Sequence, residues 1–322
     1  MKKYGVFALV LVLCRLGLGQ SVPFARLGSP FAQTNIEVVW AAPTNNLASA
    51  LWVYRALPSE VSPTVISNLV GLGSFSDKDR KNLSAALHLI SYDEPKKSLR
   101  VKTDWSFIDY QDSDAENMHI TEGVPDKEKA FEIATNWLPK LDVDRSQLAK
   151  KENGDLRFTF SELVTTLYKG RGMPAYATNI SMSDVTFKRT LDGVEISGGS
   201  ARGGCEIQIG NHAKIRRILV SWRKYTREKR YPTATPEQLL KWIREGKAVW
   251  YPPPDSPFTD LGLVKKITIT KLTPLYYSDA YGLSDKPYNW AVPFAELEAR
   301  VDNDETNFTV NIDCPLIDKS KQ

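Results

Sequence analysis

The chain has 322 residues, enough for about two domains at roughly 150 residues each. Hydrophobic residues make up 42% and charged residues 25%, near the globular average, which argues against wholesale disorder, a collagen-like chain and a polytopic membrane protein. Three cysteines and three histidines exclude a disulfide-dense scaffold and a cysteine-rich zinc array.

Residues 1–19 have the layout of a cleavable secretory signal. Two lysines precede an apolar run over residues 6–13, and glycines stand three and one positions before Gln20. The run is too short to span about 30 Å of hydrocarbon, and Arg15 interrupts it. A lipoprotein signal at Cys14 is disfavoured because a large residue precedes it. We therefore expect an exported protein, periplasmic or secreted, with no integral membrane span after signal cleavage.

Loss of this segment nearly neutralises the chain. The segment holds three basic residues and no acid, so the mature chain has 42 − 3 = 39 basic residues against 38 acidic ones, a net charge of +1. No global positive field then remains to attract nucleic acid, which is not an expected partner.

Residues 20–34 are rich in Pro, Gly and Ser without periodicity, which is typical of a linker. Residues 35–120 form the first expected unit, an α+β unit. A helix is predicted to begin at Ser62-Pro63, a capping residue followed by proline at the first helical position, and to end near Gly71. β-Branched and aromatic residues predict strands over 35–40, 51–55, 86–92, 98–103 and 105–110.

Residues 121–250 form the second expected unit, in the order helix, antiparallel sheet, helix. Apolar residues recur at a 3.6-residue period after Asp126, which predicts the first helix. Asp192-Gly193 predicts a tight hairpin turn. Thr235 is expected to cap a helix over residues 236–245. Strands are predicted over 156–160, 163–168, 184–190, 194–197, 204–209 and 215–222.

Residues 251–322 begin at a proline-rich boundary and contain further predicted strands over 264–272, 275–277, 290–294 and 308–312. The stretch is too short for a separate core, so we expect it to complete a neighbouring sheet. The predicted fold class is α+β, with antiparallel sheets and helices packed on one face, in two units.

One part of the second unit has a distinctive order of elements. An Ala-rich apolar helix precedes the sequence FKRTLDGVEISGG at residues 187–199, a turn GNHAK at 210–214 and a strand ILVSWR at 218–223. Residues 126–250 thereby resemble PepSY-like and YycH-like extracytoplasmic domains of bacteria, whereas residues 35–120 lie outside the resemblance. The resemblance implies an exported, non-catalytic module that binds or inhibits a protein partner.

No motif selects catalytic or metal-binding residues. Gly198-Gly-Ser-Ala-Arg202 departs from the Gly-x-Ser-x-Gly nucleophile motif at its last position and lies between predicted strands, which favours a hairpin loop. The three histidines are isolated and HExxH does not occur, so we expect no metal site and no cofactor. An enzyme is less favoured than a binding protein. An exported hydrolase without a recognisable motif and a structural envelope component are the alternatives.

The strongest local charge feature lies between Lys214 and Arg230, where eight basic residues are opposed by Glu228 alone. Because aromatic residues interleave with this basic run, it could dock an acidic protein or an anionic envelope polymer. A solvated strand face balanced by acids elsewhere is the alternative. The candidate binding residues are Arg216, Arg217, Trp222, Arg223, Lys224 and Arg227. We expect an exported, non-catalytic binding or regulatory module that acts on a protein or envelope partner.

Two cysteines remain after signal removal, Cys205 and Cys314, each in a strand-like segment. Export allows them to form a disulfide. It would enclose a loop of 314 − 205 = 109 residues, worth up to about 4–5 kcal/mol, and would tie the closing strands to the sheet at residues 184–222. Two separate buried thiols are the alternative.

Overall fold

The computed structural model describes residues 37–44, 47–84, 89–102, 107–115, 122–168, 175–197, 203–251, 266–278, 290–302 and 307–317. The expected signal and linker lie outside these described residues. Within the described part, no helix has both the length and the apolar character needed to cross a membrane.

The chain divides into two compact units, each assembled from segments distant in the sequence. The larger unit comprises Tyr54–Glu228 and Tyr276–Ala291, and the smaller unit comprises Met1–Val53, Lys229–Leu275 and Val292–Gln322. The boundaries expected after residues 120 and 250 therefore do not coincide with the division between the units.

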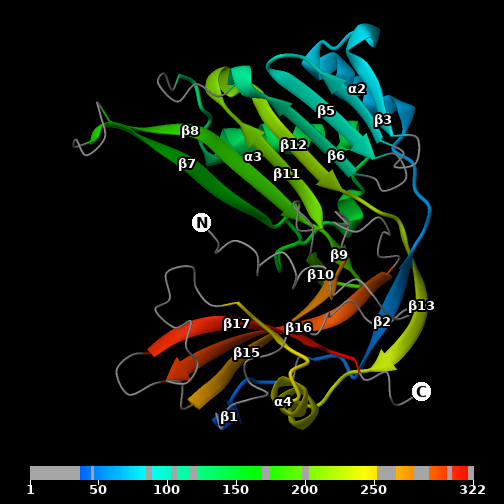
Figure 1. The fold of residues 1–322 in the computed structure, drawn as a ribbon, viewed down its shortest axis with the longest axis vertical. Helices are drawn as coiled ribbons and strands as arrows, with labels where there is room; N and C mark the ends of the chain where they lie inside the picture. The colour runs from blue at the N-terminus through cyan, green and yellow to red at the C-terminus, as the bar shows by residue number, and fades with distance from the viewer. Residues whose placement is uncertain are drawn as a thin grey trace, which may run out of the picture. The chain divides into compact units, whose positions relative to one another are not determined.

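The fold is α+β, with three α-helices among the described residues and two mostly antiparallel sheets (Figure 1). The helices are α2 (Pro63–Gly73), α3 (Lys127–Trp137) and α4 (Pro236–Arg244). The strands of one sheet are β3 (Arg80–Ser84), β4 (Leu89–Asp93), β5 (Lys97–Lys102), β6 (Phe107–Asp112), β7 (Phe158–Tyr168), β8 (Ala175–Lys188), β11 (Gly204–Ile209) and β12 (Ile215–Ser221). Those of the other are β1 (Glu37–Trp40), β2 (Ala50–Ala56), β9 (Thr190–Leu191), β10 (Val194–Ser197), β13 (Tyr225–Pro232), β14 (Val249–Tyr251), β15 (Lys266–Tyr277), β16 (Trp290–Asp302) and β17 (Asn307–Pro315).

The eight-stranded sheet lies wholly in the larger unit. Its order is β3-β4-β5-β6-β12-β11-β8-β7, and every neighbouring pair is antiparallel. β6 pairs with β12 through partners such as Tyr110 and Ile218. This pairing joins the strands of residues 80–112 to those of residues 158–221, so the boundary expected after residue 120 falls inside a single sheet.

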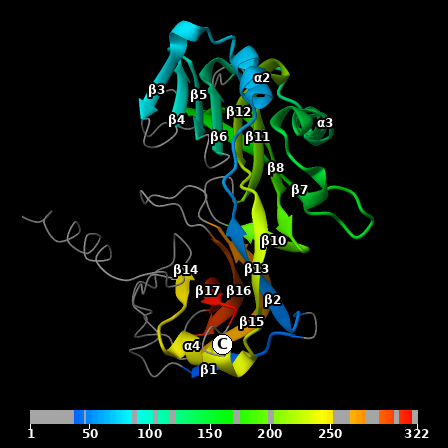
Figure 2. The same cartoon turned by 90° about the vertical axis from the view of Figure 1, so that its right-hand side faces the viewer.

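Helices α2 and α3 cover one face of this sheet, as Figure 2 shows. Successive residues of a strand point to opposite faces, so every second side chain of β8, β11 and β12 enters the core under the helices. Fully buried side chains there include Phe187, Ile207 and Ile218, packed with Leu69 of α2 and Leu138 of α3. The packing of helices on one face agrees with the predicted fold class.

The local signals for the helix starts are confirmed. The hydroxyl oxygen of Ser62 accepts a hydrogen bond from the backbone N–H of Val65 at 3.3 Å, and Thr235 does the same for Gln238 at 3.3 Å. Asp126 caps α3 through the N–H of Lys129 at 2.9 Å. Helix α2 continues two residues beyond the expected Gly71 and ends at Gly73.

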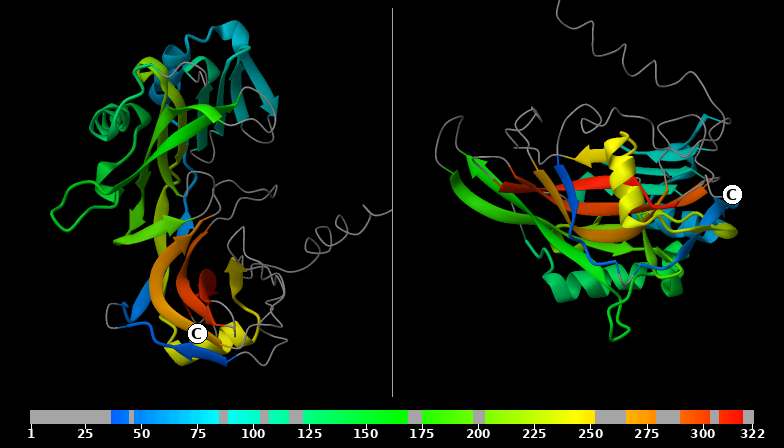
Figure 3. Two further views of the ribbon diagram at one scale, coloured as in Figure 1. Left: turned by 90° about the vertical axis from the view of Figure 1, so that its left-hand side faces the viewer. Right: turned by 90° about the horizontal axis from the view of Figure 1, so that it is seen from below.

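The nine-stranded sheet has β17 and most of the long strands β15 and β16 in the smaller unit. Figure 3 shows the C-terminal strands β16 and β17, in red and orange, beside one another. The order of this sheet is β13-β2-β16-β15-β10-β9. β1 also pairs with β15 in parallel, and β17 pairs with both β16 and β14. The C-terminal strands therefore belong to a different sheet from the one that contains residues 204–221.

The expected possibility of a disulfide between Cys205 and Cys314 is wrong. Cys205 lies in β11 of the eight-stranded sheet and Cys314 in β17 of the nine-stranded sheet, and both are free and buried. Burial raises the pKa of both thiols, so the two cysteines behave as small apolar residues of two separate cores.

Candidate functional site

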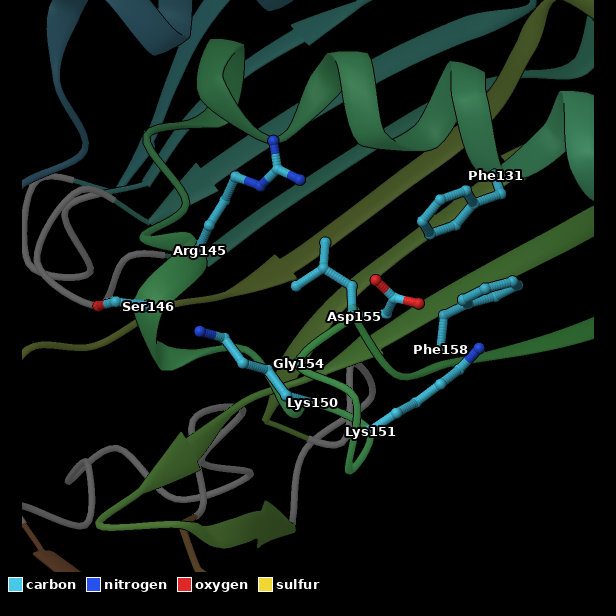
Figure 4. Close-up of a pocket in the computed structure, with 9 residues that line it drawn as sticks. Phe131, Arg145, Ser146, Lys150, Lys151, Gly154, Asp155 and Phe158 are labelled. Carbon is cyan, nitrogen blue, oxygen red and sulfur yellow. The ribbon is translucent and has the colours of Figure 1, made fainter.

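The larger unit contains a cavity of about 720 Å³ beside helix α3. Its wall comes from α3, from a short 3₁₀ turn at Arg145–Gln147, from a hairpin over residues 149–157 and from the first residue of β7. The lining residues are Phe131, Arg145, Ser146, Lys150, Lys151, Gly154, Asp155, Leu156 and Phe158 (Figure 4). We call this cavity the basic pocket.

Aromatic rings form the apolar end of the basic pocket. Phe131 of α3 and Phe158 of β7 stack with their ring centroids 4.4 Å apart and an interplanar angle of 25°. Phe187 of β8 lies behind them, 6.1 Å from Phe131 and 6.4 Å from Phe158, and is fully buried. Because the two front rings are only partly buried, an apolar group of a ligand has a flat surface to contact.

Exposed cations lie beside these rings and at the other end of the pocket. The lining holds three cations, Arg145, Lys150 and Lys151, against the carboxylate of Asp155. The ammonium of Lys151 lies 6.0 Å from the centroid of the Phe158 ring, and that of Lys127 lies 5.8 Å from it. Figure 4 shows Lys150 and Arg145 toward the end of the pocket away from the two rings, with Asp155 between.

The lysines stand on a hairpin that is fixed to the sheet. The N–H of Ala149 donates to the carbonyl oxygen of Lys188 in β8 at 2.9 Å, and the N–H of Arg157 donates back to Ala149 at 2.8 Å. The turn closes through a hydrogen bond from the N–H of Gly154 to Lys151 at 2.9 Å, with Gly154 at φ 86°. A glycine fits there because other residues rarely adopt this left-handed conformation.

A buried arginine holds the 3₁₀ turn on the other side of the pocket. The side chain of Arg189 is 2% exposed and donates from Nε and Nη2 to the amide oxygen of Gln147 at 2.8 and 2.6 Å. Its guanidinium lies 4.5 Å from the Trp222 ring and 5.3 Å from the Tyr225 ring. Burial lowers the pKa of Arg189 to about 10, so it remains a cation at neutral pH.

Asp144 completes the turn. Its carboxylate accepts hydrogen bonds from the N–H and hydroxyl of Ser146 at 2.9 and 2.7 Å and from the Gln147 amide at 3.1 Å. Hydrogen bonds from Ser146 lower the pKa of Asp144. Arg189, Gln147 and Asp144 therefore act as positioning residues, because they hold the backbone that carries Arg145.

The candidate residues of the basic run do not form one exposed surface. Trp222 and Arg223 are buried, with exposures of 9% and 4%. Their expected role as exposed binding residues is therefore wrong, because both side chains lie inside the fold. Arg217 donates from Nε to the Asp109 carboxylate at 3.0 Å. The remaining candidates are the partly buried Arg216 and the exposed Lys224 and Arg227.

Arg227 is engaged in a second cluster. It donates from Nη2 to the carboxylate of Asp192 at 2.6 Å, and the hydroxyl of Tyr54 donates to the same carboxylate. Asp192 and Gly193 have φ of 50° and 81°, which confirms the predicted hairpin turn. Burial and the Asp192 carboxylate raise the pKa of Tyr54 to about 12, so its hydroxyl stays a donor at neutral pH.

The sheet face opposite the helices carries a polar cluster. Arg217 and Gln111 both bond to Asp109, while Gln208 donates to Glu206 at 2.8 Å. Burial, with a further contribution from Asp184, raises the pKa of Glu206. In the part of the chain that the structure describes, no group of three or more His, Cys, Asp or Glu side chains could hold a metal ion.

Sequence reasoning missed the basic pocket because its residues come from four separate segments. One local signal pointed toward it, the sequence Lys150-Lys-Glu-Asn-Gly-Asp155, in which Asn-Gly predicts a hairpin turn that two lysines precede. The signal for the paired phenylalanines was weak, because 27 residues separate Phe131 from Phe158 and their contact depends on α3 packing on the sheet.

Fold and site together define an α+β protein of two units with a basic, aromatic pocket in the larger one. No family model and no curated protein matches the chain. Among solved structures it is similar to the crystal structure of an uncharacterized protein from Eubacterium rectale, at 10% sequence identity and a TM-score of 0.44. That similarity covers 86% of this chain and 85% of the other. The resemblance to PepSY-like and YycH-like domains stays a prediction.

Proposed function

We propose that this protein is an exported, non-catalytic binding module that captures an acidic segment of a protein partner in the basic pocket. The observation that carries the proposal is a stacked pair of partly exposed phenylalanines, Phe131 and Phe158, within a set of exposed cations. The pocket thus combines an apolar contact surface with positive charge on walls that the sheet and Arg189 hold in place.

The two parts of the pocket select for different parts of a ligand. An apolar or aromatic side chain gains from contact with the rings, since rings stacked at these distances add to the free energy of area burial. Carboxylates next to that side chain meet Lys150, Lys151 and Arg145, which attract them over a Debye length of about 8 Å at physiological ionic strength. A peptide that alternates acidic and aromatic residues supplies both groups.

Binding is favoured over hydrolysis by the chemistry of the lining. Asp155 is the single carboxylate among the nine lining residues, and the amide of Asn153 donates to it at 2.7 Å. Glycoside hydrolysis generally uses two carboxylates that flank the bond. The lining residues instead supply three cations and two rings, a set suited to holding an acidic ligand.

The proposal is tested by calorimetric titration of the purified chain with a hexapeptide of alternating Asp and Phe. We expect saturable binding that weakens as salt is raised. The double variant Lys150→Glu with Lys151→Glu should lose affinity by about tenfold or more, equivalent to about 1.4 kcal/mol. Replacement of Phe131 by Leu should lower the affinity for this peptide but leave the affinity for a peptide of Asp and Ala unchanged.

A matched control reverses two lysines of the basic run, Lys214→Glu with Lys224→Glu, which changes the net charge by the same amount. Both residues are exposed and lie outside the pocket lining. Equal losses in the two double variants would mean that only overall charge is sensed, and would overturn the pocket as the site. Tighter binding of polyglutamate or polyglycerol phosphate than of the aromatic peptide would assign the site to an anionic polymer instead.

Export is a separate part of the proposal and has its own test. We expect the chain recovered from the periplasm or medium to begin near Gln20, which N-terminal sequencing would show. Retention of Met1 in a membrane fraction would contradict the proposed cleavage of a signal over residues 1–19. It would not affect the proposal that the basic pocket binds an acidic segment.

A further inference from the structure

The two edges of the eight-stranded sheet differ in how they are protected. β3, at one end of the strand order, has five residues and begins with the charged pair Arg80-Lys81. β7, at the other end, has eleven residues, with Glu162 as its one charged side chain and no proline. Natural edge strands are usually short or carry lysine, proline or bulges, because an open edge can pair with another strand. β7 lacks the first three of these features.

The fourth device, a bulge, is present but falls on the neighbouring strand. The β7–β8 register passes from Leu163 opposite Met182 to Val164 opposite Ile180, so Ser181 of β8 is the extra residue. The hydroxyl of Ser181 donates to the carbonyl oxygen of Leu163 at 3.2 Å. A second shift, between Leu167 and Tyr168, also places the extra residue in β8, so β7 itself runs without an inserted residue and keeps a continuous outer edge.

Exposed apolar side chains gather at the middle of this edge. Leu163 is 46% exposed, Val164 is 52% exposed and Ile180 is 40% exposed, three of the four large hydrophobic residues exposed among the described residues. Leu163 and Val164 are consecutive and so point to opposite faces of the ribbon, while Ile180 faces Val164 across it. The apolar surface thus lies on both faces next to β7, where an added strand would cover it.

No other described strand shares this part of the ribbon. The pairing of β8 with β11 ends at Ser183 opposite Ile209, so the β7–β8 pair extends beyond the rest of the sheet (Figure 1). Added pairing along β7 would extend the ladder and give this two-stranded segment a third strand, which isolated ribbons need for stability.

We infer that β7 pairs antiparallel with β7 of a second copy of this chain, with the two-fold axis at Leu163. Leu163 is the central residue of Phe158–Tyr168, so this register pairs the strand along its whole length. It places Glu162 opposite Val164 twice and opposes no two described charges of β7. A two-fold axis makes such an interface self-complementary and closed, and it would join two eight-stranded sheets edge to edge. The self-complementary register favours a second copy over an unrelated peptide.

The register gives opposite predictions for two substitutions at one exposed position. Val164→Glu places a glutamate opposite Glu162 in both symmetry-related pairs, and like charges opposed across strands destabilise the pairing. Val164→Lys places a cation opposite Glu162 in both. By sedimentation equilibrium of the full chain, we expect the parent to be a dimer. The dimer dissociation constant should be lowered or unchanged for Val164→Lys, and it should rise about tenfold or more for Val164→Glu.

Cross-linking tests the two-fold axis directly. In a Cys14→Ser background, Leu163→Cys places two thiols next to each other at the axis, and a short bismaleimide should join two chains. Leu57→Cys is the matched control, since Leu57 has a similar exposure of 41% and lies outside β7. The native thiols are buried and should give little background. A parent chain that stays monomeric up to about 1 mM, or equal dissociation by both Val164 variants, would overturn the inference.

Discussion

Two regions of the molecule concentrate basic residues, and they use them in different ways. In the basic run of residues 214–230, Arg217 is paired with Asp109, Arg227 is paired with Asp192, and Arg223 is buried. In the basic pocket, Lys150 and Lys151 are exposed on a hairpin and face a cavity.

The difference arises from the elements that carry the charges. Arg217 lies on β12, an interior strand of the sheet, so its side chain is held on the polar face beside β6 and β11, where acids are available as partners; Arg223 and Arg227 lie beyond this strand. The hairpin of residues 149–157 stands outside that ladder and leaves its lysine side chains in water. Charge density along the sequence therefore does not give charge density at a surface.

The largest effect that would sharpen this comparison is expected at Trp222. Its ring is 9% exposed and packs against the guanidinium of Arg189. Replacement by alanine should cost about 3–5 kcal/mol of stability, as for other buried aromatic residues. Urea denaturation measures it, with Lys224→Ala as the control within the same run. A loss below about 1 kcal/mol would return Trp222 to the candidate binding residues.

A smaller loss is expected at Arg217. Its removal leaves the Asp109 carboxylate, whose side chain is 12% exposed, without the charge-assisted hydrogen bond at 3.0 Å. We expect Arg217→Ala to cost about 2 kcal/mol, in the range for hydrogen bonds to charged groups. The double variant with Asp109→Asn should recover part of this loss, because it removes the unpaired charge. If both variants are as stable as the parent, the Arg217–Asp109 pair does not contribute to stability, and Arg217 is a solvated residue of the basic run.

The fold was predictable where local chemistry decides it. Ser62 and Thr235 cap their helices because a hydroxyl can accept a bond from the open first turn, and Asp192-Gly193 turns because both residues tolerate positive φ. The α+β class followed from the mixture of periodicities. These features depend on a few neighbouring residues and on nothing elsewhere in the chain.

The rest required pairings between distant residues. Asp109 and Arg217 are 108 residues apart, and nothing local indicates that β6 and β12 are neighbours in one sheet. The first half of β8 was missed because residues 175–183, rich in polar and small residues, do not have the pattern of a buried strand. The basic pocket was missed for the same reason, since α3, the 3₁₀ turn and the hairpin meet only after folding.

A pH-dependent effect is expected at Glu206, on the polar face near Arg217. Burial and Asp184 raise its pKa, while Arg217 acts to lower it. The folded state therefore holds this proton more tightly than the unfolded chain, and the stability from this group is full below about pH 4 and is lost as pH rises through the folded pKa. Glu206→Gln should make the protein more stable at pH 7 and leave it unchanged at pH 3.5.

Asp144 provides a control of opposite sign. Hydrogen bonds from Ser146 lower its pKa, so its contribution is present at neutral pH and is lost as pH falls. Asp144→Asn should therefore destabilise the protein at pH 7. Urea midpoints at the two pH values measure both variants, and equal signs for the two would contradict the assigned environments.

The smallest effect is expected at the pocket lysines, and it is the one that separates binding from folding. Lys150 and Lys151 are exposed, and the hairpin beneath them is held by backbone hydrogen bonds that a side-chain change leaves intact. The double variant Lys150→Gln with Lys151→Gln should keep its stability within about 0.5 kcal/mol, as for most surface substitutions. Its affinity for the acidic hexapeptide should nonetheless fall, because glutamine keeps the length of the side chain and removes the charge. Urea midpoints and calorimetry on one preparation measure both quantities. A fall in stability as large as that of Arg217→Ala would show that these lysines, like Arg217 of the basic run, belong to the fold, and the contrast between the two regions would disappear.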